Sequence, residues 1–251
     1  GRPKIGAKIR QIMAENRSLF EFKQFSLHHG NPGLKISTEA CLFGAWAALH
    51  ARGSCLDIGT GCGLLASMMA QANTACSVKA LEIHLEVALL ASENIEQSPF
   101  KDRIQVIQTD VSTYQPEVKF DFICSNPPFF TNHLAATDPA RHMAIHADHL
   151  SPADLAISID RLLTDAGEFA VLYPADVLAL FEQSLLDRGF KINEKVNVLS
   201  KPDSPVLRVM ARGSRSRNSA PESSLPIKNE QGDYSPEFIE LLRPYYIIFP
   251  S

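Results

Sequence analysis

Two short stretches of the sequence hold the residue types that could do chemistry. The first is Asp57-Ile58-Gly59-Thr60-Gly61-Cys62-Gly63, an acid followed by three glycines at alternate positions. A short apolar run precedes it, and a segment with helical spacing follows. Glycines let the backbone turn sharply and approach a ligand, and a new helix brings unpaired N–H groups to the same place. The stretch predicts either a nucleotide-type cofactor site or a tight strand-to-helix turn without a ligand.

Two further acids, Glu82 and Asp110, favour the cofactor. Each follows one of the next two predicted strands, and the carboxyl ends of parallel strands form one ligand-binding edge. Glu82 is placed to accept hydrogen bonds from both hydroxyls of a ribose, and Asp110 from the exocyclic amine of a purine. An acid at such a position also serves as a simple helix cap. The three acids together favour an adenosine cofactor.

The spacing of the glycines indicates which adenosine cofactor is bound. A dinucleotide site usually has the pattern G-x-G-x-x-G, whereas this loop has D-x-G-x-G-x-G. An acid at the turn suits a positively charged sulfonium bearing an amino acid better than a diphosphate. The loop resembles the S-adenosylmethionine loop of class I methyltransferases. That resemblance implies an α/β, Rossmann-like fold with a seven-stranded sheet, parallel except for one strand and flanked by helices.

The second stretch, Asn126-Pro127-Pro128-Phe129, resembles the N-P-P-[FYW] motif of methyltransferases that modify planar, amide-like nitrogens. The exocyclic amine of adenine is a poor nucleophile because its lone pair is delocalised into the ring. The Asn126 side-chain oxygen and the Pro127 carbonyl would accept its two hydrogens and let the nitrogen pyramidalise. Phe129 offers a ring on which the flipped base stacks. The alternative is a rigid turn at the end of a strand.

Alternating strand-like and helical patterns must position both stretches, which implies a parallel sheet. We expect strands over 54–58, 77–82, 103–107, 120–125, 168–173, 190–198 and 206–212, and helices over 63–72, 85–97, 152–163, 176–187 and 236–243. Residues 213–235 read as an exposed loop. We expect residues 245–249 to pack on the core or to pair with the N-terminal strand.

The residues before the glycine loop are expected to form an N-terminal extension, 1–50, on a methyltransferase domain of residues 51–251. Within the extension the patterns predict a helix over 3–16, a strand over 20–25, a turn over 28–33 and a helix from Glu39 to His50. Ser37 or Thr38 caps the last of these helices, whose expected apolar face is Leu42, Phe43, Trp46 and Leu49.

The composition is that of a soluble globular protein, with 45% hydrophobic and 21% charged residues. No apolar run reaches the roughly 18 residues of a membrane span, and we expect no secretory signal. The five cysteines form no C-x-x-C pair and are expected to be reduced and buried in a cytoplasmic protein. The net charge of −4 argues against a strongly nucleic-acid-coated surface. Residues 1–35 and 201–217 are nevertheless rich in Lys and Arg, as either a phosphate-facing rim or solvated tails.

From about Phe20 to Phe249 the chain resembles the bacterial tRNA(Val) adenine-N6 methyltransferases. The shared stretches are Phe22–Phe25, Leu34–Glu39, Gly44–Trp46, Leu56–Gly61, Ser125–Phe129, Ala140–His142 and Asp233–Ser235. The resemblance implies transfer of a methyl group from S-adenosylmethionine to N6 of the adenine 3′ of the anticodon in a tRNA. It also implies cofactor contacts by Lys35 and Thr38, in Lys35–Ala40, where the common family pattern is K-V-G-T-D-G.

Three questions remain open at this point. The histidine-rich segment 131–150 (His133, His142, His146 and His149, with Asp138, Arg141 and Asp148) is either a lid that touches RNA or, through His142 and His146, a zinc site; we expect no metal. Other substrates of an N-P-P-[FY] enzyme are glutamine N5 of a release factor and guanine N2 or adenine N6 of ribosomal RNA. Little sequence precedes residue 54 to form a release-factor-binding domain. A non-catalytic RNA-binding protein is the remaining alternative. We expect a monomer without a membrane partner.

Overall fold

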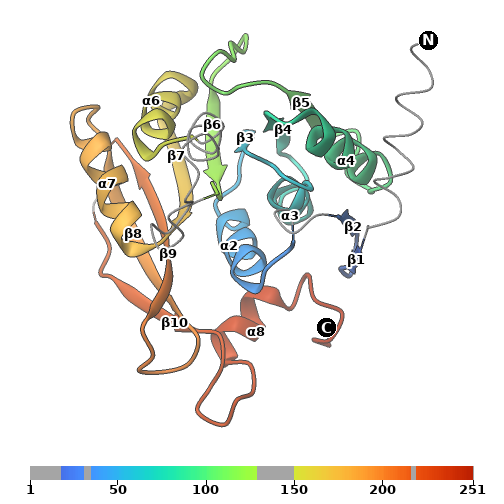
Figure 1. Ribbon diagram of the computed structural model, residues 1–251, viewed down its shortest axis with the longest axis vertical. Helices are drawn as coiled ribbons and strands as arrows, with labels where there is room; N and C mark the ends of the chain where they lie inside the picture. Colours follow the sequence, from blue (N-terminus) through green and yellow to red (C-terminus); the bar gives the residue numbers. More distant parts are fainter. Residues whose placement is uncertain (1–17, 31–34, 129–149, 216–218, 251) are drawn as a thin grey trace, which may run out of the picture.

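A sheet of eight strands runs through the computed structural model, which describes residues 18–30, 35–128, 150–215 and 219–250 (Figure 1). Its order is β10-β8-β9-β7-β6-β3-β4-β5, and only β9 runs antiparallel to its neighbours. The strands are β3 (Ser54–Ile58), β4 (Ser77–Glu82), β5 (Ile104–Gln108), β6 (Phe120–Ser125), β7 (Leu163–Tyr173), β8 (Lys191–Leu199), β9 (Val206–Ser214) and β10 (Ser223–Pro226). The predicted α/β fold with a mostly parallel sheet is confirmed.

The strand order reverses direction between β3 and β6. The chain passes from β3 to β4 and β5 on one side, and then crosses to β6 and β7 on the other. A crevice forms at the carboxyl ends of the two strands that flank such a reversal, and ligands of open α/β sheets bind there. The glycine loop follows β3 and Asn126 follows β6, so both stretches are brought to this crevice.

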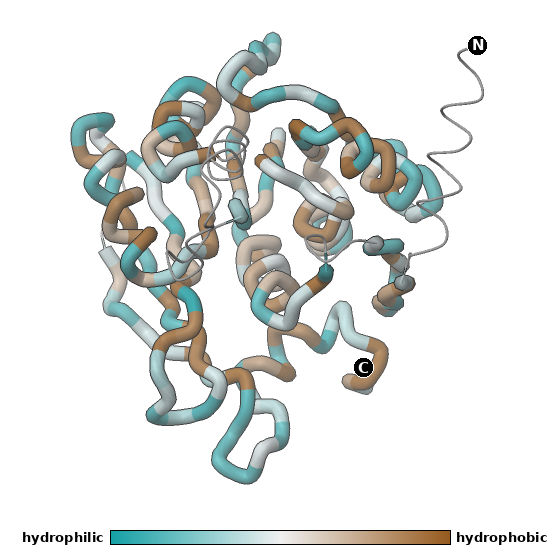
Figure 2. The backbone as a smooth tube through the Cα atoms, in the orientation of Figure 1, coloured by the Kyte–Doolittle hydropathy of each residue, from teal (hydrophilic) through white to brown (hydrophobic). Residues whose placement is uncertain are grey.

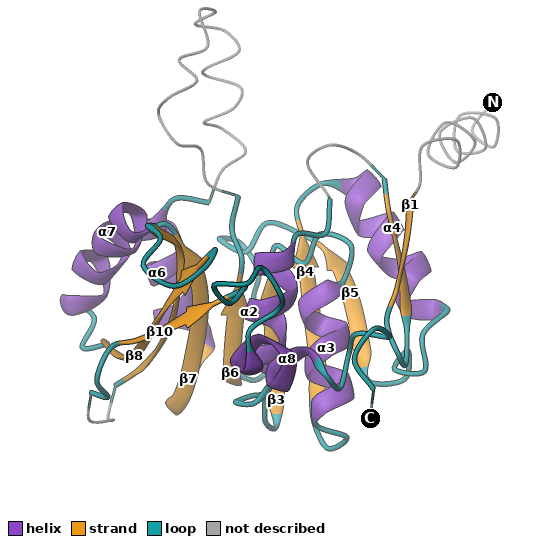
Figure 3. Ribbon diagram, turned by 90° about the horizontal axis from the view of Figure 1, so that it is seen from below, coloured by secondary structure: helices purple, strands orange, loops and turns teal. Residues whose placement is uncertain are grey.

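Helices cover both faces of the sheet. One face carries α2 (Thr38–Ala48), α3 (Leu64–Ala72), α4 (Leu85–Glu96) and α8 (Pro236–Leu242), and the other carries α6 (Pro152–Leu162) and α7 (Ala175–Leu186) (Figures 1 and 3). Each face of the sheet has its own hydrophobic core. Along β3, Cys55 packs into the core under α2, α3, α4 and α8, whereas Leu56 and Ile58 pack into the core under α6 and α7. In Figure 2 hydrophobic and hydrophilic residues alternate along α4 and α7, which is typical of helices with one face on a sheet.

Helix α2 is buried far more completely than its expected apolar face predicts. Every residue from Ala40 to Ala48 is buried, because α3 and α8 both pack against α2. Leu49, expected on the buried face, lies beyond the helix and is 67% exposed. A Cβ on Gly44 would lie 2.4 Å from the Met68 sulfur, so α2 and α3 meet at a residue without a side chain.

The prediction of one strand over 20–25 is wrong. Phe20 and Glu21 end β1 (Ser18–Glu21), and residues 22–25 form the turn that leads to β2 (Ser26–His29) of a separate hairpin. The Phe22 N–H donates to the Phe25 carbonyl at 2.8 Å, and the two buried rings stack 4.5 Å apart. The alternation of apolar and polar residues therefore reflects two aromatic side chains turned inward from one turn. The helix expected over 3–16 lies outside the described residues.

Two further boundaries differ from the prediction. The expected loop 213–235 contains β10, which adds an eighth strand and pairs in parallel with β8 in the register Leu225↔Val198. Leu225 and Ile227 are buried there, which a fully exposed loop does not explain. Strand β7 begins at Leu163, well before the expected residue 168.

The end of the chain packs back on the core, as predicted. Tyr245, Tyr246 and Phe249 are buried, and the Lys23 N–H donates to the Tyr245 carbonyl at 2.8 Å. All five cysteines are free and buried, as the sequence predicted for the thiols themselves. Within the described ranges, no helix is long and apolar enough to cross a membrane.

Candidate active site

The loop after β3 turns at three glycines whose backbones are left-handed. Gly59, Gly61 and Gly63 have φ values of +72°, +57° and +91°, which other residues adopt only with strain. The N–H groups of Gly59 and Thr60 both donate to the Leu81 carbonyl at 2.9 Å and fix the loop to β4. A Cβ on Gly59 or Gly61 would meet no atom of the described residues within 4 Å, so this part of the chain leaves the space beside the loop open. Helix α3 begins directly after it without a side-chain cap. This surface fits a cofactor that lies along the glycines.

The Asp57 carboxylate is turned into the loop rather than toward that open space. Asp57 is completely buried, and its Oδ2 accepts hydrogen bonds from the Thr60 hydroxyl at 2.6 Å and from the Ala66 N–H at 3.2 Å. Burial raises the pKa of Asp57 to about 7, the hydrogen bonds oppose this rise, and the charge of Glu82 adds to it. In this conformation Asp57 holds the start of α3 and the turn at Thr60 together.

Glu82 ends β4 next to the glycine loop and is buried. Its Oε2 accepts from the Gly61 N–H and its Oε1 from the His84 N–H, each at 3.1 Å. The Thr109 N–H donates to the Glu82 carbonyl at 3.0 Å, which places Asp110 beside it. Asp110 is exposed, and its Oδ1 accepts from the Ser112 N–H at 2.8 Å. Glu82 and Asp110 therefore follow one another along the edge of the sheet, as their spacing predicted.

The turn after β6 is joined directly to the glycine loop. Ser125 lies opposite Ile58 in the register of the two strands, and its hydroxyl donates to the Ile58 carbonyl at 2.8 Å. Ile58 precedes Gly59, and Ser125 precedes Asn126. Asn126 is half-buried and Pro127 is buried, whereas Phe129 lies outside the described residues. The structure thus brings Asn126 and Pro127 together with the glycines of the loop.

Lys35 and Thr38 are not joined to this cluster by any hydrogen bond found in the described part of the chain. Lys35 is exposed. Thr38 begins α2 and lines a small pocket of about 250 Å³ with Glu39, Lys228 and Tyr234, among others. Ser37, at the first glycine of the family pattern, accepts from the Ala40 N–H at 3.1 Å and caps α2. The departure from the pattern therefore has a local structural role.

Three residues hold this site together through contacts that the sequence did not predict. Thr60 and Ser125 are adjacent in sequence to the glycine loop and to Asn126, and a hydroxyl next to these motifs was the only sequence feature that pointed to them. Arg161 of α6 has no such signal, because its partners lie far away in the chain. Its guanidinium donates to the carbonyls of Val111 at 2.5 Å, Ser112 at 3.4 Å and Tyr114, and so holds the loop that follows Asp110.

Two of the arginines expected at a phosphate-facing rim are used inside the protein. Arg212 forms ion pairs of 2.6 Å with Glu168 and with Glu194, and burial of the guanidinium opposes the rise in its pKa that these partners cause. Arg215 pairs with Asp160 and lies over the Phe190 ring. The rim interpretation is therefore wrong for these two residues. The histidines and acids of segment 131–150 lie outside the described residues.

Comparison with known proteins agrees with this geometry. Residues 41–154, which hold both the glycine loop and Asn126, match the family model described as "Methyltransferase small domain". Among solved structures, a predicted O-methyltransferase from Agrobacterium tumefaciens superposes with a TM-score of 0.66 at 16% identity, over 81% of this chain and 95% of that one. A ribosomal protein L11 methylase from Lactobacillus delbrueckii gives a TM-score of 0.52 at 22% identity, over 74% and 84%. These similarities establish the class I methyltransferase fold.

Curated relatives extend the similarity over almost the whole chain. A tRNA1(Val) (adenine(37)-N6)-methyltransferase from Dyadobacter fermentans is 36% identical over 92% of this chain and 98% of its own length. A protein of the same name from Parabacteroides distasonis is 38% identical over 91% and 97%. The glycine loop, the Asn126 turn and the sheet order thus occur in a chain that belongs to the tRNA1(Val) (adenine(37)-N6)-methyltransferase family.

Proposed function

We propose that this protein methylates N6 of adenine 37 in a tRNA. The proposed substrate is tRNA1(Val), which the names of its relatives specify. S-adenosylmethionine, the methyl donor of class I methyltransferases, supplies a methyl group bound to a positively charged sulfur. The observation that carries the proposal is the hydrogen bond between Ser125 and Ile58. It sets the Asn126 turn against the glycine loop, as transfer between a bound cofactor and a base requires.

Asn126 and Pro127 are proposed to act on the base through acceptors alone. The Asn126 side-chain oxygen and the Pro127 carbonyl accept the two hydrogens of the exocyclic amine, so that the nitrogen presents its lone pair to the methyl group. Tandem prolines restrict the turn, and the half-buried position of Asn126 reduces competition from water. Phe129 is proposed to stack on the flipped adenine.

The cofactor is proposed to lie along Gly59, Gly61 and Gly63, on the side where Gly59 and Gly61 meet no side chain of the described residues. Glu82 takes the ribose hydroxyls, and its bond to the Gly61 N–H keeps the carboxylate in place for them. Asp110 takes the adenine amine of the cofactor, and Asp57 acts by shaping the loop. Lys35 and Thr38 are proposed to reach the cofactor from the start of α2.

We further propose that the protein acts as a monomer in the cytoplasm, with residues 1–50 as an extension of the domain formed by 51–251. The tRNA is its macromolecular partner. The relatives' names favour tRNA over a release factor or ribosomal RNA, and the intact acid and glycines of the loop, together with Asn126, favour an enzyme over a binding protein.

The decisive experiment measures nucleosides from a strain that lacks the gene. Digested tRNA should lose N6-methyladenosine in the valine isoacceptor, and the purified protein should restore it on a transcript with adenine 37. A transcript with guanine 37 is the matched control and should accept no methyl group. Unchanged tRNA together with a methyl group lost from ribosomal RNA or a release factor would overturn the substrate assignment.

A further inference from the structure

Asn94, near the end of α4, makes three hydrogen bonds to backbone groups of two distant segments. Its side chain is almost completely buried at 1% exposure. Oδ1 accepts from the His28 N–H, and Nδ2 donates to the carbonyls of His28 and Cys62, all at 2.9 Å. One amide thus joins β2 of the N-terminal hairpin to the glycine loop between Gly61 and Gly63. Because water does not reach these groups, the Asn94 amide serves as their hydrogen-bond partner within the protein.

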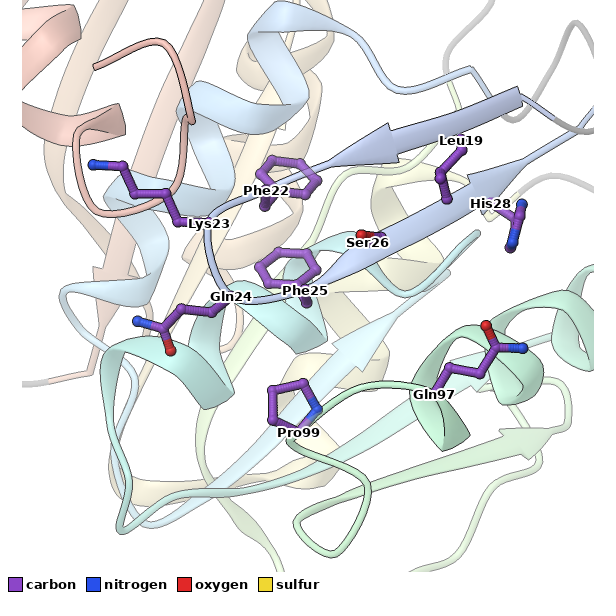
Figure 4. Close-up of a pocket in the computed structure, with 9 residues that line it drawn as sticks. All are labelled: Leu19, Phe22, Lys23, Gln24, Phe25, Ser26, His28, Gln97 and Pro99. Carbon is purple, nitrogen blue, oxygen red and sulfur yellow. The ribbon is translucent and has the colours of Figure 1, made fainter. Parts of the chain in front are cut away.

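The hairpin needs such an attachment because it does not belong to the central sheet. Among the strands of the described residues, β1 and β2 pair only with each other. A pocket of about 370 Å³ opens between the hairpin and the turn after α4, lined by Leu19, Phe25, His28, Gln97 and Pro99, among others (Figure 4). The interface between hairpin and helix is therefore incompletely packed. The Asn94 bonds to His28, a residue that lines this pocket, hold β2 on α4.

The same turn of α4 supports the glycine loop from behind. Ile95 lies against Gly63, where a Cβ would come within 3.3 Å of its side chain. Asn94 holds the Cys62 carbonyl, and Glu82 holds the Gly61 N–H from the other side. Two peptide units of the loop, 60–61 and 62–63, are thus held by side chains from different elements. Loss of the Asn94 bond leaves the buried Cys62 carbonyl without this donor, and unit 62–63 then keeps only the 3.0 Å bond from the Gly63 N–H to the Thr60 carbonyl among the bonds found in the described part of the chain.

We infer that Asn94 is a positioning residue of the cofactor site, and that it couples the hairpin at His28 to the glycine loop. The inference rests on the proposed function, because it assumes that S-adenosylmethionine binds along that loop. It goes beyond that function because it predicts that binding of the cofactor stabilises the hairpin through Asn94, without direct contact between hairpin and cofactor. Fixing the loop with a ligand stabilises the Cys62 carbonyl, which stabilises Asn94 and through it the His28 backbone.

Calorimetry of S-adenosylmethionine binding tests the positioning role. Asn94→Asp has nearly the same volume and keeps an acceptor for the His28 N–H, but its carboxylate repels the carbonyls that the amide bonded. We expect the Kd to rise about tenfold or more. Asn193→Ala is the matched control, because Asn193 is also a buried amide, bonded to Ser214 at 2.9 Å on the far side of the sheet. The control should lower the Tm and leave the Kd unchanged.

Hydrogen exchange, first of the wild-type protein and then of the two variants, tests the coupling. Addition of S-adenosylmethionine should slow exchange of the His28 amide, although His28 lies in the hairpin. The effect should disappear in Asn94→Asp and persist in Asn193→Ala. If the exchange rate of the wild-type His28 amide does not change on addition of the cofactor, the coupling is overturned. If the Kd rises equally in Asn193→Ala, the positioning role is overturned. Both results are compatible with full methyl transfer by the wild type, whereas a wild type that binds no S-adenosylmethionine contradicts the proposed function itself.

Discussion

The hydroxyl of Thr60 donates a hydrogen bond of 2.6 Å to the buried carboxylate of Asp57, inside the loop that the two residues begin. The bond does not fully compensate for burial, since the pKa of Asp57 is raised from 3.8 to about 7. Asp57 therefore binds a proton more tightly in the folded protein than in the unfolded chain. The stability it contributes is present below pH 4 and is lost as the pH rises through 7.

We expect the Tm of the ligand-free protein to fall between about pH 4 and pH 7, the interval between the two pKa values of Asp57. The loss attributable to Asp57 is on the order of 2–4 kcal/mol. Asp57→Asn should flatten this part of the profile, because the amide still accepts from Thr60 and does not ionise. Thermal melts of both proteins across the pH range measure the effect. An equally steep profile in the variant would assign the pH dependence to other groups.

Replacement of Asn126 by Ala should separate binding from transfer. The variant removes one acceptor for the amine but leaves the glycine loop intact, so we expect kcat to fall by roughly 10²–10³ while cofactor affinity is retained. Single-turnover transfer to tRNA and calorimetry measure the two quantities. Glu82→Gln should show the opposite pattern. We expect a weaker affinity for the cofactor and a smaller decrease in the rate of methyl transfer once cofactor and tRNA are bound. Retained turnover in Asn126→Ala would remove Asn126 from the proposed mechanism.

Ser125→Ala should show how much the link between the two halves of the site matters. It leaves the Ile58 carbonyl without its donor, at a cost of about 1–3 kcal/mol in unfolding free energy. Because the turn at Asn126 then moves relative to the loop, we expect kcat to fall about tenfold. Ser98→Ala is the control, since Ser98 is also buried and donates at 2.8 Å to a carbonyl, that of Ile95. Equal losses of kcat in the two variants would mean that Ser125 acts only through stability.

Arg161→Met should loosen the loop that follows Asp110. The methionine keeps much of the apolar volume but donates nothing to the carbonyls of Val111, Ser112 and Tyr114. We expect the KM for S-adenosylmethionine to rise several-fold, about 1 kcal/mol of binding, with kcat nearly unchanged. Arg188→Met provides the comparison, because Arg188, just after α7, also donates to a carbonyl, that of Ser184 four residues earlier in the chain. A lower kcat at unchanged KM would contradict a role in cofactor binding.

The strands that carry the site were predictable from sequence, and the contacts that hold the site together were not. β3 and β4 have the boundaries that their apolar runs predict, because both strands are buried and end at an acid or a glycine turn. β10 escaped prediction because it is short and its partner β8 lies far away in the chain. The turn is predicted as part of one strand because Phe20 and Phe22 alternate with Glu21 and Lys23, although Phe22 and Phe25 stack on each other within the turn.

Side-chain bonds to distant backbone groups leave no pattern in a single sequence. Asn94 sits on α4 among residues of ordinary helical spacing, and its partners are 66 and 32 positions away. Asp57 was predictable as a site residue from its place before the glycines. That its carboxylate is turned inward depends on Thr60 and Ala66, and so on the three-dimensional turn.

The contact between Lys23 and Tyr245 makes the order of synthesis matter. The turn of the first hairpin is closed by the carbonyl of a residue near the end of the chain, and the Phe20 ring lies 6.0 Å from that of Tyr246. A nascent chain emerges from the ribosome with its N-terminus first, so the hairpin can meet α4 early, through the Asn94 bonds to His28, but gains its contacts with Tyr245 and Tyr246 only after α8 has been made. The sheet can assemble while the chain is still growing, whereas the turn of the hairpin is closed only by the segment that follows α8.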